Sequence, residues 1–469
     1  MSKDTQKYLR TLLEQYGRPA PPGKQALLDA FADSAAIEQA FGEMTRIQQR
    51  IMESWKENLE INDVLSKPLP VPNAQVGQPY RFKLDPVQAG LPALSFFDLA
   101  APPESGLVYN VDDYTLSGTP LTAGTFPLTF RFRVAVSAED APLQEKTIQL
   151  LVNPNPRSLW KNLEADTSDP YWKPDTAQAR LVMGDKTLIV ASKRGRSHAH
   201  EGKFRDDDFG AANLAGGWGV ITVADGAGSA KFSRQGSRIV CNAVVNFFKE
   251  KVTNAHWTHL DQAITTAQAN PTPEQQKTLS RLVLDHLGKA AHDAHQQLNA
   301  AAAEAQAATR DFATTLLFLV IKKFDFGYFI ASFMVGDGGM GIFNKDTGQV
   351  LTLGTPDGGE FAGQTRFVSM PEIFKDESFY KRFSIRTVPD FTALVLMTDG
   401  ITDPKFQTDA NLTKVEYWNA LWDDLQGRNA EGVAVPLDRN DEQAPQALLN
   451  WLDFWSPGNH DDRTIAILF

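Results

Sequence analysis

Carboxylate side chains recur beside short apolar runs that have the length and composition of buried strands. In chain order the carboxylates are Asp206-Asp207-Asp208, Asp225, Asp337, Asp399 and Asp461-Asp462. The apolar runs beside them are 188–192, 220–224, 329–335, 393–397 and 464–469. A single Asp-Gly after a strand is ordinary turn chemistry. Five such clusters indicate instead a site for hard divalent cations, which prefer oxygen ligands and often retain water.

The stretch around Asp225 shows how such a site is positioned. Asp225 stands at the end of the run 220–224, and Gly226 directly behind it lets other atoms approach the backbone closely. Apolar residues then recur at helical spacing over 239–248. The sequence therefore predicts a strand, a tight turn that presents a carboxylate, and a helix that begins nearby.

Composition places the chain among ordinary soluble proteins. The 469 residues carry a formal net charge of −11, which disfavours general binding to nucleic acid or to an anionic membrane. The single cysteine, Cys241, excludes an intramolecular disulfide, and the N-terminus has no apolar signal core. We expect a cytoplasmic protein, with no nucleic-acid partner and no membrane insertion.

The N-terminal third divides into two parts with different periodicity. Residues 1–62 are predicted to be helical, with apolar side chains at three-to-four spacing from Ile37 to Leu59. That stripe either faces a core or docks a partner. Residues 66–155 have the alternation of half-buried strands, clearest over 128–136, and residues 156–176 are expected to be a linker packed against another part of the chain.

The β-rich part resembles bacterial immunoglobulin-like domains. The resemblance rests on Gly77-Gln78-Pro79-Tyr80 and on the later Leu116-Ser117-Gly118-Thr119-Pro120. It implies an all-β immunoglobulin-like sandwich over about 85 residues. Because no chemical constellation lies within it, we interpret this part as a spacer or binding module.

Residues 177–469 resemble the metal-dependent serine/threonine protein phosphatases of the PP2C class, in particular a bacterial subgroup. The matching segments are 195–198, 207–209, 224–229, 312–316, 335–337, 359–361, 397–400 and 461–464. Each is short, and their shared order over about 290 residues makes the resemblance specific. It implies an α+β domain, a four-layer α-β-β-α sandwich whose metals lie in a cleft at one end of the sheets.

The resemblance also implies roles for the carboxylates. Asp225 would bridge two Mn²⁺ or Mg²⁺ ions, and the carbonyl oxygen of Gly226 would bind one of them. Asp207, Asp399 and Asp461 would complete the metal shell, and Asp337 matches a position associated with a third ion in bacterial members. Asp461 is preferred to its neighbour Asp462, because the family aspartate stands three residues before the threonine, here Thr464.

A pair of divalent ions would acidify a water molecule and offset charge on the phosphoryl oxygens, with Asp225 and Asp399 as the central catalytic carboxylates. The family pattern fails at two positions. The phosphate-binding arginine that eukaryotic-type members have five residues before the first metal aspartate is replaced by Gly202, and the histidine that follows the bridging Asp-Gly in many members is replaced by Ala227. The candidate substitutes are Arg194, Arg196 and Arg205 for phosphate binding and His198 for the proton donor.

The leading hypothesis is a bacterial protein phosphatase that acts on phosphoserine and phosphothreonine, opposite a serine/threonine kinase, with the N-terminal parts as docking modules for protein partners. A second hypothesis is a phosphatase-like interaction protein that binds phosphorylated partners with little or no turnover, which the two departures at Gly202 and Ala227 favour. A third is a phosphatase that acts on a small molecule, which would leave the β-rich part without a role.

Overall fold

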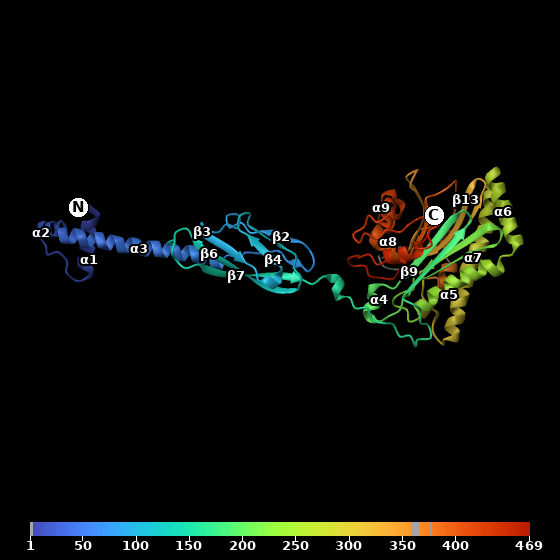
Figure 1. Ribbon diagram of the computed structural model, residues 1–469, viewed down its shortest axis with the longest axis horizontal. Helices are drawn as coiled ribbons and strands as arrows, with labels where there is room; N and C mark the ends of the chain where they lie inside the picture. The colour runs from blue at the N-terminus through green and yellow to red at the C-terminus, as the bar shows by residue number, and fades with distance from the viewer. Residues whose placement is uncertain (1–2, 358–364, 376) are drawn as a thin grey trace. The chain divides into compact units, whose positions relative to one another are not determined.

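The chain divides into two compact units, Met1–Leu159 and Trp160–Phe469 (Figure 1). The computed structural model describes residues 3–357, 365–375 and 377–469. The family segment predicted at 359–361 lies outside the described residues. None of the described helices is both long enough and apolar enough to cross a membrane.

The first unit begins with three helices, α1 (Lys3–Gln15), α2 (Gln25–Ala32) and α3 (Ala35–Ser66). Leu9 and Leu28 form a small apolar cluster that fastens α1 and α2 to each other. Most of the apolar stripe of α3 faces solvent, and the side chains of Ile51 and Trp55 are 61% and 64% exposed. Over residues 47–59 the stripe therefore has no core to face within the described part of the first unit.

The rest of the first unit is built from strands. They are β1 (Ala74–Gln75), β2 (Tyr80–Lys83), β3 (Leu94–Ala100), β4 (Leu107–Asn110), β5 (Thr115–Gly118), β6 (Gly124–Val134) and β7 (Gln144–Asn153). They form a four-stranded sheet, β1-β7-β6-β3, and a three-stranded sheet, β2-β5-β4, whose side chains share one core. The predicted alternation is present in β6, where Leu128, Phe130, Phe132 and Val134 are fully buried. The immunoglobulin-like resemblance of this part stays a prediction.

The second unit contains two sheets in which every described strand pairing is antiparallel. The first sheet has the order β10 (Asp208–Asn213), β11 (Trp218–Ala224), β12 (Leu316–Phe324), β13 (Gly327–Val335), β16 (Phe383–Val388). The second has the order β15 (Gln349–Thr352), β14 (Gly339–Asn344), β17 (Ala393–Met397), β18 (Arg463–Leu468), β9 (Lys186–Lys193), β8 (Thr176–Met183). The helices are α4 (Arg196–Glu201), α5 (Ser233–Asn246), α6 (Asn254–Ala269), α7 (Pro273–Glu304), α8 (Asp399–Phe406), α9 (Val415–Leu425) and α10 (Ala444–Trp451).

Three apolar clusters hold this unit together. Inward side chains of both sheets, such as Val190, Ile221 and Leu394, form one cluster. Helices α5, α6 and α7 pack with the first sheet, and α8, α9 and α10 pack with the second. Because the central strands have neighbours on both faces, their sequences are continuous apolar runs and do not alternate. This explains why the sequence predicted β11, β13, β17 and β18 from short apolar stretches.

The strand register brings distant carboxylates to one end of the two sheets. Asp208 pairs with Ala224, so Asp207 and Asp225 leave neighbouring strands at the same edge. Met397 pairs with Ile465, so Asp399 and Asp461 also leave neighbouring strands together. The backbone N–H of Asp206 donates to the Asp462 carboxylate, 256 residues away, so the ends of the two pairs of strands meet.

The segment predicted to be a linker packs on the second unit from Trp160 onward. The Trp160 ring lies 4.4 Å from the ring of His460, and the Nδ1 atom of His200 accepts the backbone N–H of Lys161. Lys173 is only 1% exposed and donates to the carbonyl oxygen of Asp207, at the end of the sheets where the carboxylates lie, which we call the carboxylate edge. A polar, proline-rich segment thus contributes to the core of the unit.

Candidate metal centre

Three of the predicted carboxylates meet at the carboxylate edge of the sheets. Asp225 follows β11, Asp337 follows β13 and Asp399 begins α8 directly after β17. Each of the three offers a carboxylate oxygen that lies within 4.8 Å of those of the other two. The tight turns that the sequence predicted at these positions therefore face one another in space.

Asp207 joins the same group through a contact between the two sheets. Its side chain is fully buried, and its Oδ2 accepts a hydrogen bond of 2.8 Å from the Thr398 hydroxyl. The backbone N–H of Thr398 donates to the carbonyl oxygen of Thr464 at 3.1 Å, which fixes Thr398 on the second sheet. Lys173 supports Asp207 from below by donating to its carbonyl oxygen at 2.7 Å.

Burial, and with it the closeness of other negative charges, raises the pKa of two carboxylates in this group. Burial, followed by the nearby charges of Asp399 and Asp207, raises the pKa of Asp225 well above its usual range. Burial and the charges of Asp461 and Asp337 do the same to the pKa of Asp399. The buried Oδ1 atoms of Asp207, Asp337 and Asp399 have no hydrogen-bond partner among the described residues. Clustered, unpartnered carboxylate oxygens fit a hard divalent cation.

Gly226 contributes through its missing side chain. It pairs with Thr314 across an isolated antiparallel bridge. A Cβ atom at this position would lie 2.8 Å from the carbonyl oxygens of both Asp206 and Ser233. The backbone directly after Asp225 thus passes through a gap that admits only glycine.

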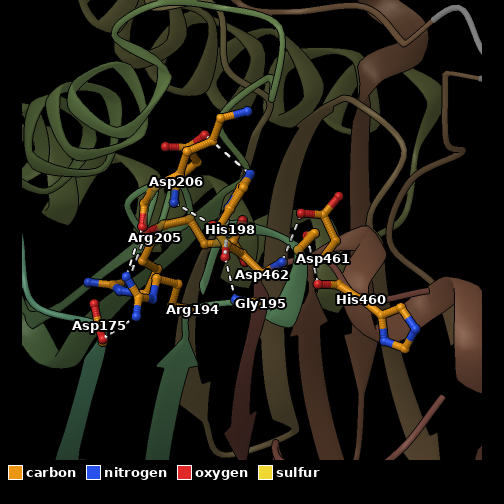
Figure 2. A network of polar contacts seen from close by, with 12 residues as sticks. Asp175, Arg194, Gly195, His198, Arg205, Asp206, His460, Asp461 and Asp462 are labelled. Atoms are coloured by element: carbon orange, nitrogen blue, oxygen red, sulfur yellow. Dashed lines mark hydrogen bonds and ion pairs between the residues drawn. The ribbon is translucent and has the colours of Figure 1, made fainter. Parts of the chain in front are cut away.

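A second group, around Asp462, lies at the start of β18 (Figure 2). The Asp462 side chain is 1% exposed and accepts a backbone hydrogen bond from Gly195 at 2.6 Å and another from Asp206. The Nδ1 atom of His198 lies 3.0 Å from Asp462 Oδ1. Burial alone would raise the pKa of Asp462, but the His198 contact and these N–H groups hold it below its usual range. Asp462 is thereby committed to the local backbone.

His198 is held in its charged form by the same contact. Burial disfavours the imidazolium, but the Asp462 carboxylate and, beyond it, Asp206 and Asp461 raise the pKa of His198 to about 9. Asp461 differs from its neighbour. Its Oδ1 accepts the backbone N–H of Asp462 at 2.8 Å, and burial and the Asp462 charge raise its pKa. These contacts favour Asp461 over Asp462 as the residue with ligand capacity to spare.

The three candidate arginines are already occupied by protein acceptors. Arg194 donates to the Lys203 and Leu163 carbonyl oxygens and pairs with Asp175. Arg196 donates to the Phe454 and Asp453 carbonyl oxygens and to the Asp453 carboxylate. The buried guanidinium of Arg205 donates to the Pro174 and Asp207 carbonyl oxygens and to Ser192. The structure gives these side chains roles in holding α4 and the Asp207 loop, and we do not assign the phosphate to them.

The departures from the family pattern have local explanations. Gly202 terminates α4 in the left-handed conformation, with φ of 70°, a position that glycine fills without strain. Ala227 is buried and donates its backbone N–H to the carbonyl oxygen of Ala313 at 3.0 Å. The backbone conformation at Gly202 and the buried contacts at Ala227 therefore restrict which side chains these two positions can hold.

Several residues of the site could not be found from the sequence. Lys173 lies in the segment expected to be a linker, and its ammonium group pairs with Asp208 at 3.1 Å. Thr398 was only a neighbour of Asp399 until the sheets brought it to Asp207. Asp403 and Asp409 extend the acidic group, since burial and then the charge of Asp337 raise the pKa of each. Of these residues, Asp403 had the clearest sequence signal, because it lies one helical turn after Asp399 on α8 and so on the same face of the helix.

Comparison with known proteins gives one family match. The model of the family described as "Protein phosphatase 2C" matches residues 194–452, and no curated protein matches the chain in sequence. Solved structures with similarity include a bacterial serine phosphatase, at 13% identity over 60% of this chain and 96% of that one, with a TM-score of 0.35. The serine/threonine phosphatase Stp1 from Staphylococcus aureus has 14% identity over 63% and 98%, with a TM-score of 0.34. The serine/threonine phosphatase PstP/Ppp from Mycobacterium tuberculosis has 13% identity over 60% and 97%, with a TM-score of 0.34.

Proposed function

Since the chain belongs to the protein phosphatase 2C family of protein-serine/threonine phosphatases, we propose that it hydrolyses phosphoserine and phosphothreonine in proteins at the carboxylate edge of the second unit. The observation that carries the proposal is the meeting of carboxylate oxygens of Asp225, Asp337 and Asp399 within 4.8 Å of one another. Asp207 adds a fourth carboxylate through Thr398.

In this proposal the carboxylates hold Mn²⁺ or Mg²⁺. Asp225 and the carbonyl oxygen of Gly226 would bind the central pair of ions, Asp207, Asp399 and Asp461 would complete their shell, and Asp337 would hold a third. When bound, divalent ions lower the pKa of water and offset negative charge on the phosphoryl oxygens. The two sheets, with helices on their outer faces, would form the four-layer sandwich of the family and keep these side chains rigidly placed.

The chain's own residues would position the group and manage the proton. Thr398 orients Asp207 by donating to Oδ2, and Lys173 holds the Asp207 backbone. His198 belongs with Asp461 and Asp462 to one cluster of polar atoms within 4.8 Å. Because its pKa is raised to about 9, its ring carries a proton near neutral pH, and we keep it as the candidate donor to the leaving oxygen in place of the missing histidine.

The first unit would bring the enzyme to its protein partners. Five apolar side chains of α3, from Ile47 to Leu59, are largely exposed, and exposed apolar patches commonly mark interaction sites. We further propose that the enzyme is a cytoplasmic bacterial phosphatase that opposes a serine/threonine kinase.

Hydrolysis of an aryl phosphate by the full-length protein tests the proposal, with Mn²⁺, with Mg²⁺ and with a chelator. We expect turnover with metal, none in chelator, and none in Asp225→Asn at any metal concentration. A phosphothreonine peptide measured in parallel separates a protein phosphatase from one that acts on small molecules. A folded protein that turns over neither substrate with either metal contradicts the proposal.

A further inference from the structure

A cavity of about 670 Å³ opens directly beside the proposed metal centre, a volume within the range of ordinary ligand sites. One wall is Ala227 to Ala230, the chain that immediately follows Asp225 and Gly226. A second wall is the turn at 308–313, and the third is the segment 367–372. The cavity is therefore made by three separate segments of the second unit.

The three walls are tied to the proposed site by backbone hydrogen bonds. Ala227 donates to the carbonyl oxygen of Ala313 at 3.0 Å, and Val368 donates to that of Thr314 at 2.9 Å. Thr314 in turn donates from its hydroxyl to the carbonyl oxygen of Asp225 at 2.8 Å. The cavity therefore lies next to the turn that carries Asp225.

The walls combine apolar and polar residues. The apolar lining residues are Ala227, Ala230, Ala308, Ala313, Phe367, Met370 and Pro371. The charged lining residues are Arg310, Asp311 and Glu372, two acidic groups and one basic group, so the rim does not favour an additional acidic group. A concave apolar surface beside a polar reaction centre suits an apolar side chain, because the gain comes from removing that side chain from water.

We propose that this cavity is a substrate subsite that takes one apolar side chain within a few residues of the phosphorylated serine or threonine. The inference rests on the proposed phosphatase function and adds a substrate class to it, namely phosphoprotein segments with an apolar flanking residue. It also gives a physical reason for a peptide to be preferred to a small phosphate ester, since only a peptide fills the cavity.

A set of phosphothreonine peptides tests the subsite with the full-length enzyme. Each peptide has alanines around the phosphothreonine and a single leucine, whose position differs from peptide to peptide and covers the three positions on either side. We expect one leucine position to raise kcat/KM about tenfold or more over the all-alanine peptide. Ala308→Trp, which places an indole in the cavity from an exposed wall position, should bring that ratio close to one.

Two further variants keep the test sharp. Met370→Ala removes apolar wall and should also reduce the ratio, whereas Ala303→Trp, exposed on α7 and outside the cavity lining, should keep it. Equal kcat/KM for all peptides in the wild type, or a leucine preference that Ala308→Trp leaves intact, would overturn the subsite.

A binding measurement separates failure of the subsite from failure of the proposed function. Fluorescence anisotropy of the same labelled phosphopeptides with the full-length protein reports the leucine preference without turnover. A preference in binding that Ala308→Trp abolishes, in a protein that hydrolyses nothing, retains the subsite and rejects the phosphatase. Hydrolysis of all peptides with no preference in either assay rejects the subsite and retains the phosphatase.

Discussion

The carboxylate of Asp462 accepts the backbone N–H of Gly195 at 2.6 Å, across a separation of 267 residues. The contact fastens the start of β18 to the start of α4, and His198 lies on the same carboxylate at 3.0 Å. The two adjacent aspartates therefore have different structural roles. Asp462 holds the backbone together, and Asp461 is left with ligand capacity beside the carboxylate group.

The variants Asp461→Asn and Asp462→Asn should separate these roles. Asp462→Asn removes the charge from a buried pair, and we expect the free energy of unfolding to fall by about 2 kcal/mol or more. Asp461→Asn should abolish aryl-phosphate hydrolysis and weaken Mn²⁺ binding while the metal-free protein stays as stable as the wild type. Urea unfolding in chelator and calorimetric Mn²⁺ titration measure the two effects. The reverse pattern would assign the metal to Asp462.

The variants Asp225→Asn and Asp399→Asn should lose hydrolysis without losing the fold. Because burial and then repulsion from neighbouring carboxylates raise the pKa of both groups, removal of one charge relieves the metal-free protein. We expect its free energy of unfolding in chelator to rise. Stabilisation by added Mn²⁺, measured as the shift in melting temperature, should shrink in both variants. Wild-type turnover in either one would discard the assignment of the central carboxylates.

The stabilising contribution of His198 to the metal-free protein should be lost at alkaline pH. Its pKa is raised from 6.5 to about 9 on folding, so its contribution is fully present below pH 6.5 and is lost as the pH rises through 9. The difference in unfolding free energy between the wild type and His198→Gln should therefore fall by an amount on the order of 3 kcal/mol between pH 6 and pH 10. Urea unfolding in chelator at several pH values gives this difference. His259→Gln, at an exposed position on α6, should show no such trend.

Gly226→Ala should disable the site by sterics alone. The new Cβ would meet the carbonyl oxygens of Asp206 and Ser233 at 2.8 Å, so the turn that carries Asp225 has to shift. We expect kcat/KM for an aryl phosphate to fall at least 100-fold, with a loss of stability of about 1–3 kcal/mol. Gly228→Ala is the matched control, because a Cβ there has no heavy atom within 4 Å. Equal activity of the two variants would show that the tight passage at Gly226 is not required.

The catalytic unit should be separable from the first unit only if residues 160–176 are kept. A fragment 160–469 retains Lys173, which donates to the carbonyl oxygens of Asp207 and Arg234, and should hydrolyse an aryl phosphate like the full chain. A fragment 177–469 lacks this buried lysine and should be much less stable in urea. If the first unit docks partners, the longer fragment should act more slowly on the phosphoprotein substrate. Equal stability of the two fragments would make residues 160–176 a simple linker.

Sequence alone determined those features that depend on local pattern and on order along the chain. Continuous apolar runs predicted β11, β13, β17 and β18, because strands covered on both faces have no polar positions. The prediction of a PP2C-type phosphatase is confirmed by the family match over residues 194–452. The order of the Asp-containing turns was enough to identify the family, because the functional residues of each turn lie within a few positions of one another.

Tertiary structure decided the features that depend on which partner a side chain meets. Arg194, Arg196 and Arg205 have the chemistry to bind phosphate, but they donate to protein acceptors that include carbonyl oxygens 31, 257 and 31 residues away, respectively. The family spacing to Thr464 preferred Asp461 to Asp462, but only the structure shows that Asp462 accepts the backbone N–H of Gly195. Lys173 looked like part of a polar linker and proved to be buried beneath Asp207. Hydrogen bonds and burial are set by contacts across the sheets, and those contacts exist only once the strands have found their register.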